Sequence, residues 1–321
     1  MPESVRDSPE FAEHLADLEA RLVVLPAGRR EAVPAAVEAA SAAGARLVVP
    51  DGDKNVAPLL LALLRAGRRR PPVSVLLMRT TLPGGPERAT AGMVVKPPLT
   101  WLLARLPGVR MRFLTDAFGV VVRRRGFPGV LPVRDPVTVP DGIPAPRASG
   151  GPFRLGVFGV VTARKNVPLL LEALAELPTV QLVVAGRCDP AVAAALAESS
   201  LVGRLEVDDR LLAEKEFDAA VAGVDAVAVM HDNDAPSGIV AEAAARGVPV
   251  LGPARGWASS MVTGTGIGEV ADLGAPDPVG EVRAALTRLI DSRERRVAAT
   301  RRAATRLGVQ DFVSGMLGDV T

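Results

Sequence analysis

Two acidic residues bracket a turn in the stretch MHDNDAPSGIVAEAAARGVPVLGP, residues 230–253. Asp234 precedes a Pro-Ser-Gly turn, and Glu242 follows eight residues later. Ser237 can cap a helix that begins near Gly238, and the first amides of such a helix favour an anion. Glu242 would then lie roughly 6–7 Å along the helix, where its carboxylate can accept hydrogen bonds from a sugar diol. The residue types also fit a plain turn aspartate and a surface glutamate, so both interpretations stay open.

A second polar loop, GVVTARKN (159–166), places Arg164 and Lys165 at the start of an expected helix. Backbone N–H groups and the helix dipole already favour an anion at that position. Lysine is scarce in this arginine-rich chain, and a lysine at a helix start favours a point-charge contact with phosphate. A solvent-exposed loop lysine is the plainer alternative.

Three segments together resemble the C-terminal donor domain of GT-B glycosyltransferases, most closely the retaining family 4. They are FGVVTARKNVPLLLEALAELPTVQLVVAG, FDAAVAGVDAVAVM and DAPSGIVAEAAARGVPVLGP, and the resemblance covers residues 151 to about 305. It implies that Lys165 neutralises a donor diphosphate and that Glu242 binds ribose. Asp234 stands where the family has a first glutamate, which makes Lys165, Asp234 and Glu242 the expected catalytic set. The resemblance implies further donor contacts from Gly159, Ser237, Gly238, Ile239 and Val240.

The chain departs from the family pattern at several positions. Aspartate in place of glutamate at 234 shortens the reach by one methylene. The family's arginine after the first-strand glycine is Val160 here, so Arg164 or Arg187 in AGRCDP is expected to supply the charge. The family's N-terminal-domain histidine has no counterpart, because His14 belongs to an expected amphipathic helix. His231 and Arg79 are additional candidates for contacts with the donor or acceptor.

The resemblance implies a front-face reaction in which a donor phosphate oxygen takes the acceptor proton and no metal or cofactor is required. Catalysis then depends on positioning and on stabilising the leaving diphosphate. Asp-Asn-Asp at 232–234 also matches the short metal-binding signature of GT-A transferases. It lies about 230 residues into the chain, which is late for a GT-A core. GTGIGE (264–269) lacks a preceding strand and following helix, so we expect a loop there rather than a dinucleotide site.

Apolar strands alternate with amphipathic helices along the whole chain, which predicts an α/β fold with parallel sheets covered on both faces. The segment 140–153 is rich in Pro and Gly and is the best linker in the sequence. We therefore expect a GT-B architecture of two Rossmann-like, doubly wound domains facing a cleft. Residues 1–147 would form the acceptor-side domain and 148–321 the nucleotide-sugar donor domain. By resemblance, the last helix, DFVSGMLGDV, would cross back onto the first domain.

Charge divides the chain unevenly, with 21 Lys and Arg against 14 Asp and Glu in residues 1–150, and 17 against 22 in residues 151–321. Basic clusters at 67–72 and 121–127 indicate either solvated faces or a surface for an anionic or lipid-linked acceptor. They lack interleaved aromatics, which argues against nucleic acid. The single cysteine, Cys188, and the lack of an apolar span predict a cytoplasmic protein, in contact with a membrane at most peripherally. A catalytically silent or epimerase-like GT-B protein that binds a nucleotide sugar or a partner protein remains the alternative function.

Overall fold

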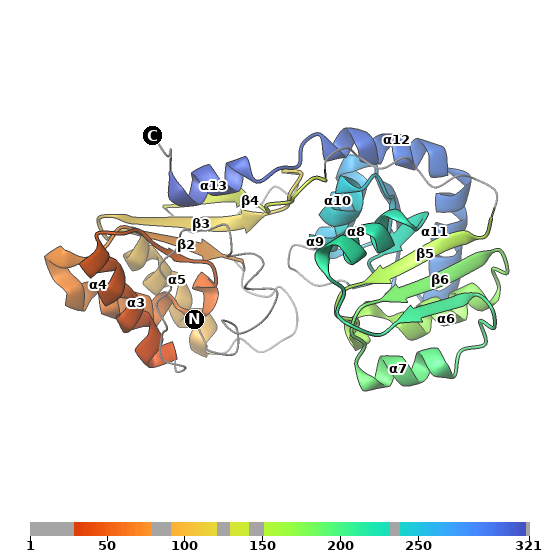
Figure 1. Cartoon of the computed structure of the whole chain (residues 1–321), viewed down its shortest axis with the longest axis horizontal. Coiled ribbons are helices and arrows are strands. Elements are labelled where there is room, and N and C mark those ends of the chain that lie inside the picture. Colours follow the sequence, from red (N-terminus) through yellow and green to blue (C-terminus); the bar gives the residue numbers. More distant parts are fainter. Residues whose placement is uncertain (1–28, 79–90, 121–128, 141–150, 232–237, 319–321) are drawn as a thin grey trace. The chain divides into compact units, whose positions relative to one another are not determined.

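The computed structural model describes residues 29–78, 91–120, 129–140, 151–231 and 238–318 (Figure 1). They form two compact units. The first comprises residues 29–78, 91–114, 129–133 and 312–318, and the second comprises residues 115–120, 134–140, 151–231 and 238–311. The expected division between residues 147 and 148 lies outside the described residues.

The second unit is built on a six-stranded parallel sheet with the order β10-β9-β8-β5-β6-β7. The chain starts in the middle of the sheet, winds outward through β6 and β7, and then returns to build the other half from β8. Its strands are β5 (Phe153–Phe158), β6 (Val180–Ala185), β7 (Leu205–Asp208), β8 (Ala226–Ala228), β9 (Val250–Pro253) and β10 (Gly268–Ala271). This order creates a topological switch point between β5 and β8, where ligands of doubly wound sheets bind.

Helices cover both faces of this sheet because alternate strand residues are apolar on each side. Val227 of β8 faces a core with α8, α9, α10 and α12, while Ala226 and Ala228 face a core with α6, α7 and α11. The helices are α6 (Val167–Ala175), α7 (Pro190–Ala197), α8 (Glu214–Ala222), α9 (Gly238–Ala245), α10 (Gly256–Thr265), α11 (Pro278–Asp291) and α12 (Arg293–Ala304). A 3-10 turn, η3 (Ala163–Lys165), precedes α6. Figure 1 shows α8 and α6 on opposite sides of β5 and β6.

The first unit has a smaller sheet with the order β1-β2-β3-β4, in which β1, β2 and β3 are parallel. The strands are β1 (Leu47–Val49), β2 (Val73–Leu77), β3 (Val109–Thr115) and β4 (Val130–Arg134). Helices α3 (Arg29–Ala43), α4 (Val56–Ala66) and α5 (Ala91–Ala104) pack on one face, and 3-10 turns η1 (Gly52–Lys54) and η2 (Gly67–Arg69) flank α4. The α/β class, with parallel strands and helices on both sides, is therefore confirmed in each unit.

The last helix, α13 (Gln310–Leu317), covers the other face of the first sheet (Figure 1). Met316 packs with Leu76 and Leu114, and its carbonyl accepts a hydrogen bond from the buried Ser74 hydroxyl. The Arg112 side chain donates to the Gly315 carbonyl at 2.9 Å. The C-terminal segment thus completes the first unit after the chain has built the second.

The prediction of a loop at 264–269 is wrong. Residues 264 and 265 end α10, Gly266 closes that helix in the left-handed region at φ 72°, and β10 starts at Gly268. A side chain at 268 would collide with the backbone of Val250 on β9, so glycine is needed for close strand pairing there. The glycines that resembled a ligand loop serve a helix end and a strand instead.

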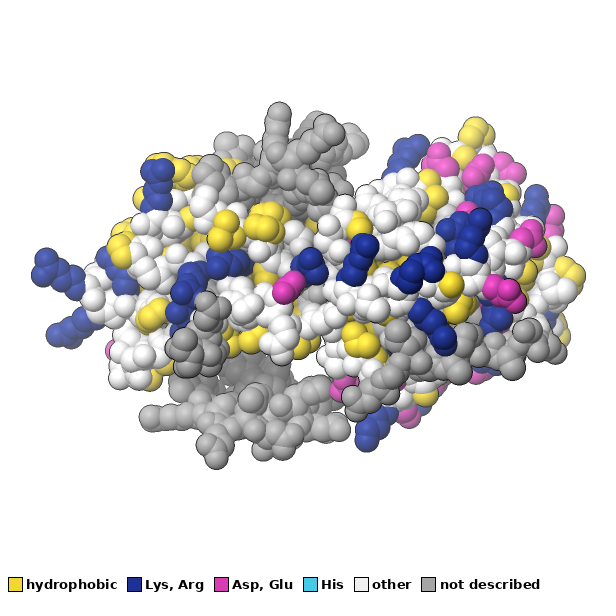
Figure 2. All heavy atoms as spheres, turned by 90° about the horizontal axis from the view of Figure 1, so that it is seen from above, with side chains coloured by type: hydrophobic (Ala, Val, Ile, Leu, Met, Phe, Trp, Pro, Cys, Tyr) yellow, Lys and Arg dark blue, Asp and Glu magenta, His cyan; other side chains and the backbone are white. Residues whose placement is uncertain are grey.

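Figure 2 shows the charge difference on one face: acidic side chains gather over the second unit, whereas the coloured charged side chains of the first unit are mostly basic. Across the described ranges, none of the helices combines the length and apolar character that crossing a bilayer requires.

Candidate functional site

The candidate site lies at the carboxyl ends of β5, β6 and β8, on both sides of the switch point. The segment after β5 carries Lys165, the segment after β6 carries Arg187, and the chain after β8 reaches His231. Parallel strands bring their carboxyl ends to one edge of the sheet, so these three segments meet although they are distant in sequence.

Lys165 is half-buried at the end of η3, and its ammonium group donates a hydrogen bond to the carbonyl of Phe158, the last residue of β5. Gly159 lies beside the ammonium group, because a β-carbon added there would be 3.6 Å from the Lys165 Nζ. The residue next to the ammonium group therefore carries no side chain. Burial, and then the positive charge of Arg164, lower the pKa of Lys165 to about 8. A partly desolvated cation at a sheet edge gains strongly from an anionic ligand.

Asn166 holds the lysine loop in place. It adopts the left-handed region at φ 49°, the only non-glycine residue among those described to have a positive φ. Its Nδ2 donates to the Met230 carbonyl at 2.6 Å, which ties the segment after β5 to the segment after β8. Asparagine tolerates this conformation better than most residues. Both sides of the switch point are therefore linked through one side chain.

A second connection ties the segments after β5 and β6. Asp189 caps α7 through the Val192 N–H at 2.9 Å and accepts from the Ala163 N–H at 3.0 Å. Gly186 has a φ of 131°, and a β-carbon there would lie 2.1 Å from the Gly159 carbonyl oxygen. The two backbones approach so closely at this edge that only glycine fits at 186.

Arg164 and Arg187 are exposed at the same edge, and neither side chain forms a hydrogen bond or ion pair with a described residue. His231 is half-buried directly after Met230. The arrangement therefore presents one desolvated ammonium group and two uncommitted guanidinium groups at the ends of adjacent strands. Such a set of cations is suited to a diphosphate.

Helix α9 supplies the second group of predicted residues. Gly238 begins the helix with open space around its Cα, and Ile239 is half-buried. The side chain of Val240 is fully buried in the core with α8 and α10, so only its backbone can meet a ligand. Asp234, Ser237 and Arg79 lie outside the described residues.

Glu242 is half-buried on α9 and forms an ion pair with Arg246, one turn further along the helix. The Arg246 side chain is only 6% exposed and also pairs with Asp218 of α8. Glu242 Oε1 accepts no hydrogen bond from the described residues, whereas Oε2 is engaged by Arg246. The structure thus holds this carboxylate in a defined orientation with one oxygen unoccupied.

Asp135, which follows β4, lies close enough to Glu242 for the two carboxylates to interact electrostatically. Burial first, and then the negative charges of Glu242 and Asp116, raise the pKa of Asp135 to about 6. Asp116 is fully buried and accepts from the Phe118 N–H at 2.9 Å. Below about pH 6 Asp135 is a neutral hydrogen-bond donor beside α9.

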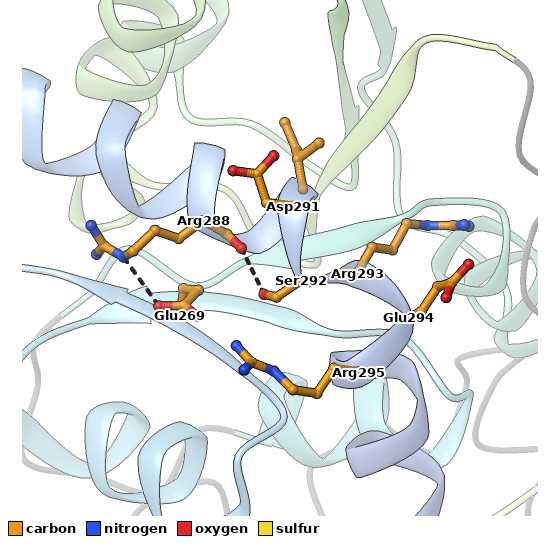
Figure 3. Close-up of a pocket in the computed structure, with 8 residues that line it drawn as sticks. Glu269, Arg288, Asp291, Ser292, Arg293, Glu294 and Arg295 are labelled. Atoms are coloured by element: carbon orange, nitrogen blue, oxygen red, sulfur yellow. Dashed lines mark hydrogen bonds and ion pairs between the residues drawn. The ribbon is translucent and has the colours of Figure 1, made fainter.

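A different hollow, of about 780 Å³, lies where α11 meets α12 (Figure 3). It adjoins the start of β10 and the end of α11, so it belongs to the amino-terminal edge of the sheet. Two of its three arginines are paired: Arg288 with Glu269, and Arg293 with Asp225 at 2.7 Å. These pairs hold helices to strands, and we exclude this hollow from the candidate site.

The sequence did not single out Asn166, Gly186, Asp189 or Asp135. The pattern Asn-Val-Pro carried a usable signal for Asn166, because a proline near a helix start makes the preceding asparagine a natural cap. For Asp135 the sequence carried no such signal, because its neighbour Glu242 belongs to α9, which follows Asp135 by over a hundred residues. In the part of the chain that the structure describes, no group of three His, Cys, Asp or Glu side chains is arranged to hold a metal.

No protein-family model and no curated protein matches the chain significantly. Solved structures are similar to it throughout. HepE from Anabaena, in complex with UDP, has a TM-score of 0.67 and 16% identity over 94% of this chain and 86% of its own. Sucrose-phosphate synthase from Thermosynechococcus elongatus has a TM-score of 0.62 and 15% identity, over 94% and 81%. WaaG, a glycosyltransferase involved in lipopolysaccharide biosynthesis, has a TM-score of 0.58 and 14% identity, over 92% and 98%.

At these identities the similarity shows the fold alone. It confirms the expected fold class, since the structures that the chain resembles include GT-B glycosyltransferases. This chain has the two-sheet parallel α/β fold of the GT-B glycosyltransferases.

Proposed function

We propose that this protein is a retaining glycosyltransferase that moves a hexose-like sugar from a UDP- or GDP-type donor to an acceptor, without a metal ion. The acceptor we propose is anionic or lipid-linked and is bound by the basic first unit. The observation that carries the donor assignment is Lys165, a partly desolvated ammonium group at the switch-point edge, next to Arg164 and Arg187.

In this proposal the donor diphosphate lies across the carboxyl ends of β5 and β6. Lys165 and the two arginines balance its charge, and the amides at the start of α9 contact its oxygens. The positive charge stabilises the diphosphate most when it leaves with the electrons of the glycosidic bond. Binding and leaving-group stabilisation are thus assigned to the same cations.

Glu242 is assigned to the ribose of the donor. Its Oε1 oxygen accepts no hydrogen bond from the described residues, and its ion pair with Arg246 keeps the carboxylate oriented. A carboxylate held in this way can accept hydrogen bonds from the ribose hydroxyls at little entropic cost. Asp234 is assigned to the donor sugar.

The proposed reaction forms the new bond on the face of the sugar that the diphosphate leaves. The acceptor oxygen attacks the anomeric carbon, the bond to the diphosphate oxygen breaks, and a phosphate oxygen takes the acceptor proton. No separate protein base is required, so a first unit without the expected histidine is compatible with activity. Structures of HepE with UDP and with UDP-glucose support a nucleotide sugar as the ligand of this fold.

Calorimetric titration with UDP and GDP, and with their glucose and mannose conjugates, tests the donor site. Lys165→Ala removes a charge-assisted contact worth about 1.5–3 kcal/mol, so we expect roughly 10- to 100-fold weaker binding. Lys215→Ala, at an exposed lysine of α8, is the matched control and should leave binding unchanged. If no nucleotide binds the wild-type protein, the transferase proposal fails.

Glu242→Gln separates the ribose assignment from the fold, because it keeps the side-chain shape. We expect weaker binding of the nucleotide and a smaller change for a ribose-free diphosphate. If nucleotide affinity does not change, the assignment of Glu242 to the ribose is wrong, whereas the assignment of Lys165 to the diphosphate is unaffected. Nucleotide binding without sugar release to water or acceptor would favour the catalytically silent protein, and a change of the donor sugar itself would favour an epimerase.

A further inference from the structure

A surface of the first unit combines exposed apolar and basic side chains on two neighbouring helices. Helices α3, α4 and α5 form one layer on the sheet, on the face opposite α13 (Figure 1), and α4 contacts both of the others. Because they pack on the same face of the sheet, their outward stripes face the same solvent. We call the outward stripes of two of them the α4–α5 face, which comprises Leu61, Leu64, Arg65, Arg68, Trp101 and Leu102.

The spacing explains why these residues share a face. Positions 61, 64 and 65 of α4 are separated by three- and four-residue steps, as are 98, 101 and 102 of α5, which places each set on one side of its helix. Arg68 lies beyond the end of α4, in η2, and Arg105 directly follows α5. The opposite side of α4 is core: Leu59 and Leu63 are fully buried. Apolar residues on the outward side therefore add nothing to the core that holds the helix.

Exposure of the apolar members is high for side chains of their size. Leu61 is 49% exposed, Leu64 51%, Trp101 39% and Leu102 41%. The guanidinium of Arg105 stacks on the Trp101 ring at 3.7 Å from its centroid. A partly exposed indole, with an apolar body and a polar N–H, is typical of the boundary between headgroups and acyl chains.

The charge of this face has one sign. Neither α4, η2 nor α5 contains an acidic residue. Arg65, Arg68 and Arg69 are exposed and form no ion pair with a described residue. Unpaired basic side chains beside apolar ones gain from a surface that offers both negative headgroups and an apolar interior.

We propose that the α4–α5 face binds the surface of an anionic lipid membrane. Leu61, Leu64 and Trp101 enter the headgroup region, while Arg65 and Arg68 contact lipid phosphates. A second copy of the chain fits less well, because a symmetric dimer would place these like charges opposite each other. Four exposed apolar side chains are also few beside the roughly 20–30 residues that each partner gives to a stable interface.

Cosedimentation with vesicles, without any nucleotide, tests this proposal. The wild-type protein should bind vesicles of equal parts phosphatidylcholine and phosphatidylglycerol at low salt and should not bind phosphatidylcholine alone. Arg65→Gln combined with Arg68→Gln should weaken partitioning roughly tenfold or more. The matched control, Arg295→Gln combined with Arg302→Gln, removes two exposed arginines of α12 and should not change it.

The apolar part is tested in the same way. Leu61→Gln with Leu64→Gln should weaken vesicle binding, whereas Val202→Gln with Leu211→Gln, at exposed apolar residues of the second unit, should not. Thermal unfolding of each variant checks that the substitutions leave the fold intact, as expected at exposed positions. Brominated lipid should quench the emission of Trp101 in a Trp257→Phe protein, since Trp257 is buried and would otherwise mask the signal.

Three results would overturn the proposal. One is equal binding to neutral and anionic vesicles, and another is equal binding by the surface variants and their controls. The third is a dimer in sedimentation analysis that the Leu61→Gln and Leu64→Gln substitutions dissociate, which would assign the face to a second copy. Because no nucleotide is present, failure here leaves the donor-site proposal untouched, and failure of nucleotide binding leaves this one untouched.

Discussion

Two groups of cations in the second unit have different surroundings: those beside the hollow at the amino-terminal edge of the sheet, and those that follow β5 and β6. At the amino-terminal edge, Arg293 pairs with Asp225, and Arg288 with Glu269. At the carboxyl-terminal edge, Arg164 and Arg187 have no partner among the described residues, and Lys165 meets only a carbonyl. Paired cations lock helices onto strands, whereas unpaired ones at strand ends are available to a ligand. This contrast is our reason for choosing the carboxyl-terminal edge, and not the hollow at the amino-terminal edge, as the candidate site.

The largest effect should come from breaking a pair at the amino-terminal edge. Arg293→Ala leaves the Asp225 carboxylate, whose side chain is 5% exposed, without its cation, and should cost about 3–5 kcal/mol of unfolding free energy. The protein that remains folded should bind nucleotide with unchanged affinity. Urea unfolding followed by circular dichroism measures the first effect, and calorimetry the second. Arg295→Ala, at an exposed neighbour in α12, should stay within about 0.5 kcal/mol of the wild type.

Gly186→Ala, at the carboxyl-terminal edge, should have a smaller effect on stability than Arg293→Ala but should also weaken nucleotide binding. The new β-carbon would meet the Gly159 carbonyl oxygen at 2.1 Å, so the segments after β5 and β6 must separate. We expect a loss of about 1–3 kcal/mol in unfolding free energy together with at least tenfold weaker nucleotide binding. Gly203→Ala is the control: its φ is also positive, at 72°, but nothing lies within 4 Å of the added carbon. If Gly186→Ala and Gly203→Ala weaken nucleotide binding equally, the close approach of Gly186 to Gly159 is not part of the site.

The pKa of Lys165 predicts opposite pH dependences for binding and stability. A diphosphate prefers the charged lysine, so nucleotide affinity should fall, about tenfold, as the pH rises from 7 to 9 through the pKa of about 8. The unfolded lysine has the higher pKa of 10.5, so the unfolded state binds more protons between pH 8 and 10.5, and stability should rise across that window. Calorimetry and chemical unfolding at matched pH measure the two trends. In Lys165→Arg, which stays charged, nucleotide affinity should lose its pH dependence.

The exposed arginines of the carboxyl-terminal edge should contribute least. Arg164→Gln or Arg187→Gln removes a solvated cation, so we expect roughly two- to fivefold weaker nucleotide binding, and less at high salt. Unfolding free energy should not change, because neither side chain has a partner to lose among the residues that the structure describes. Titrations at low and high salt check this expectation. A loss of stability as large as that of Arg293→Ala would abolish the distinction between the edges.

The hydrophobic pattern determined most of the fold. The apolar run VQLVVA forms β6, and VPLLLEALA, with its helical spacing of apolar residues, forms α6. The pattern failed at 264–269, where glycines typical of loops end α10 and begin β10. Close backbone approach between strands requires glycine there, and such contacts are set by partners that are distant in sequence.

For the candidate site, the sequence by itself determined which residue types follow which strands: Lys165 after β5, Arg187 after β6 and His231 after β8. It also indicated that Glu242 lies inside a helix. Only the tertiary structure decided what surrounds them. The ion pair of Arg246 with Asp218 of α8, the link from Asn166 to Met230, and the raised pKa of Asp135 all depend on contacts between segments that the chain brings together only on folding. Local spacing sets the order of side chains along an element, whereas desolvation and charge depend on every element packed around them.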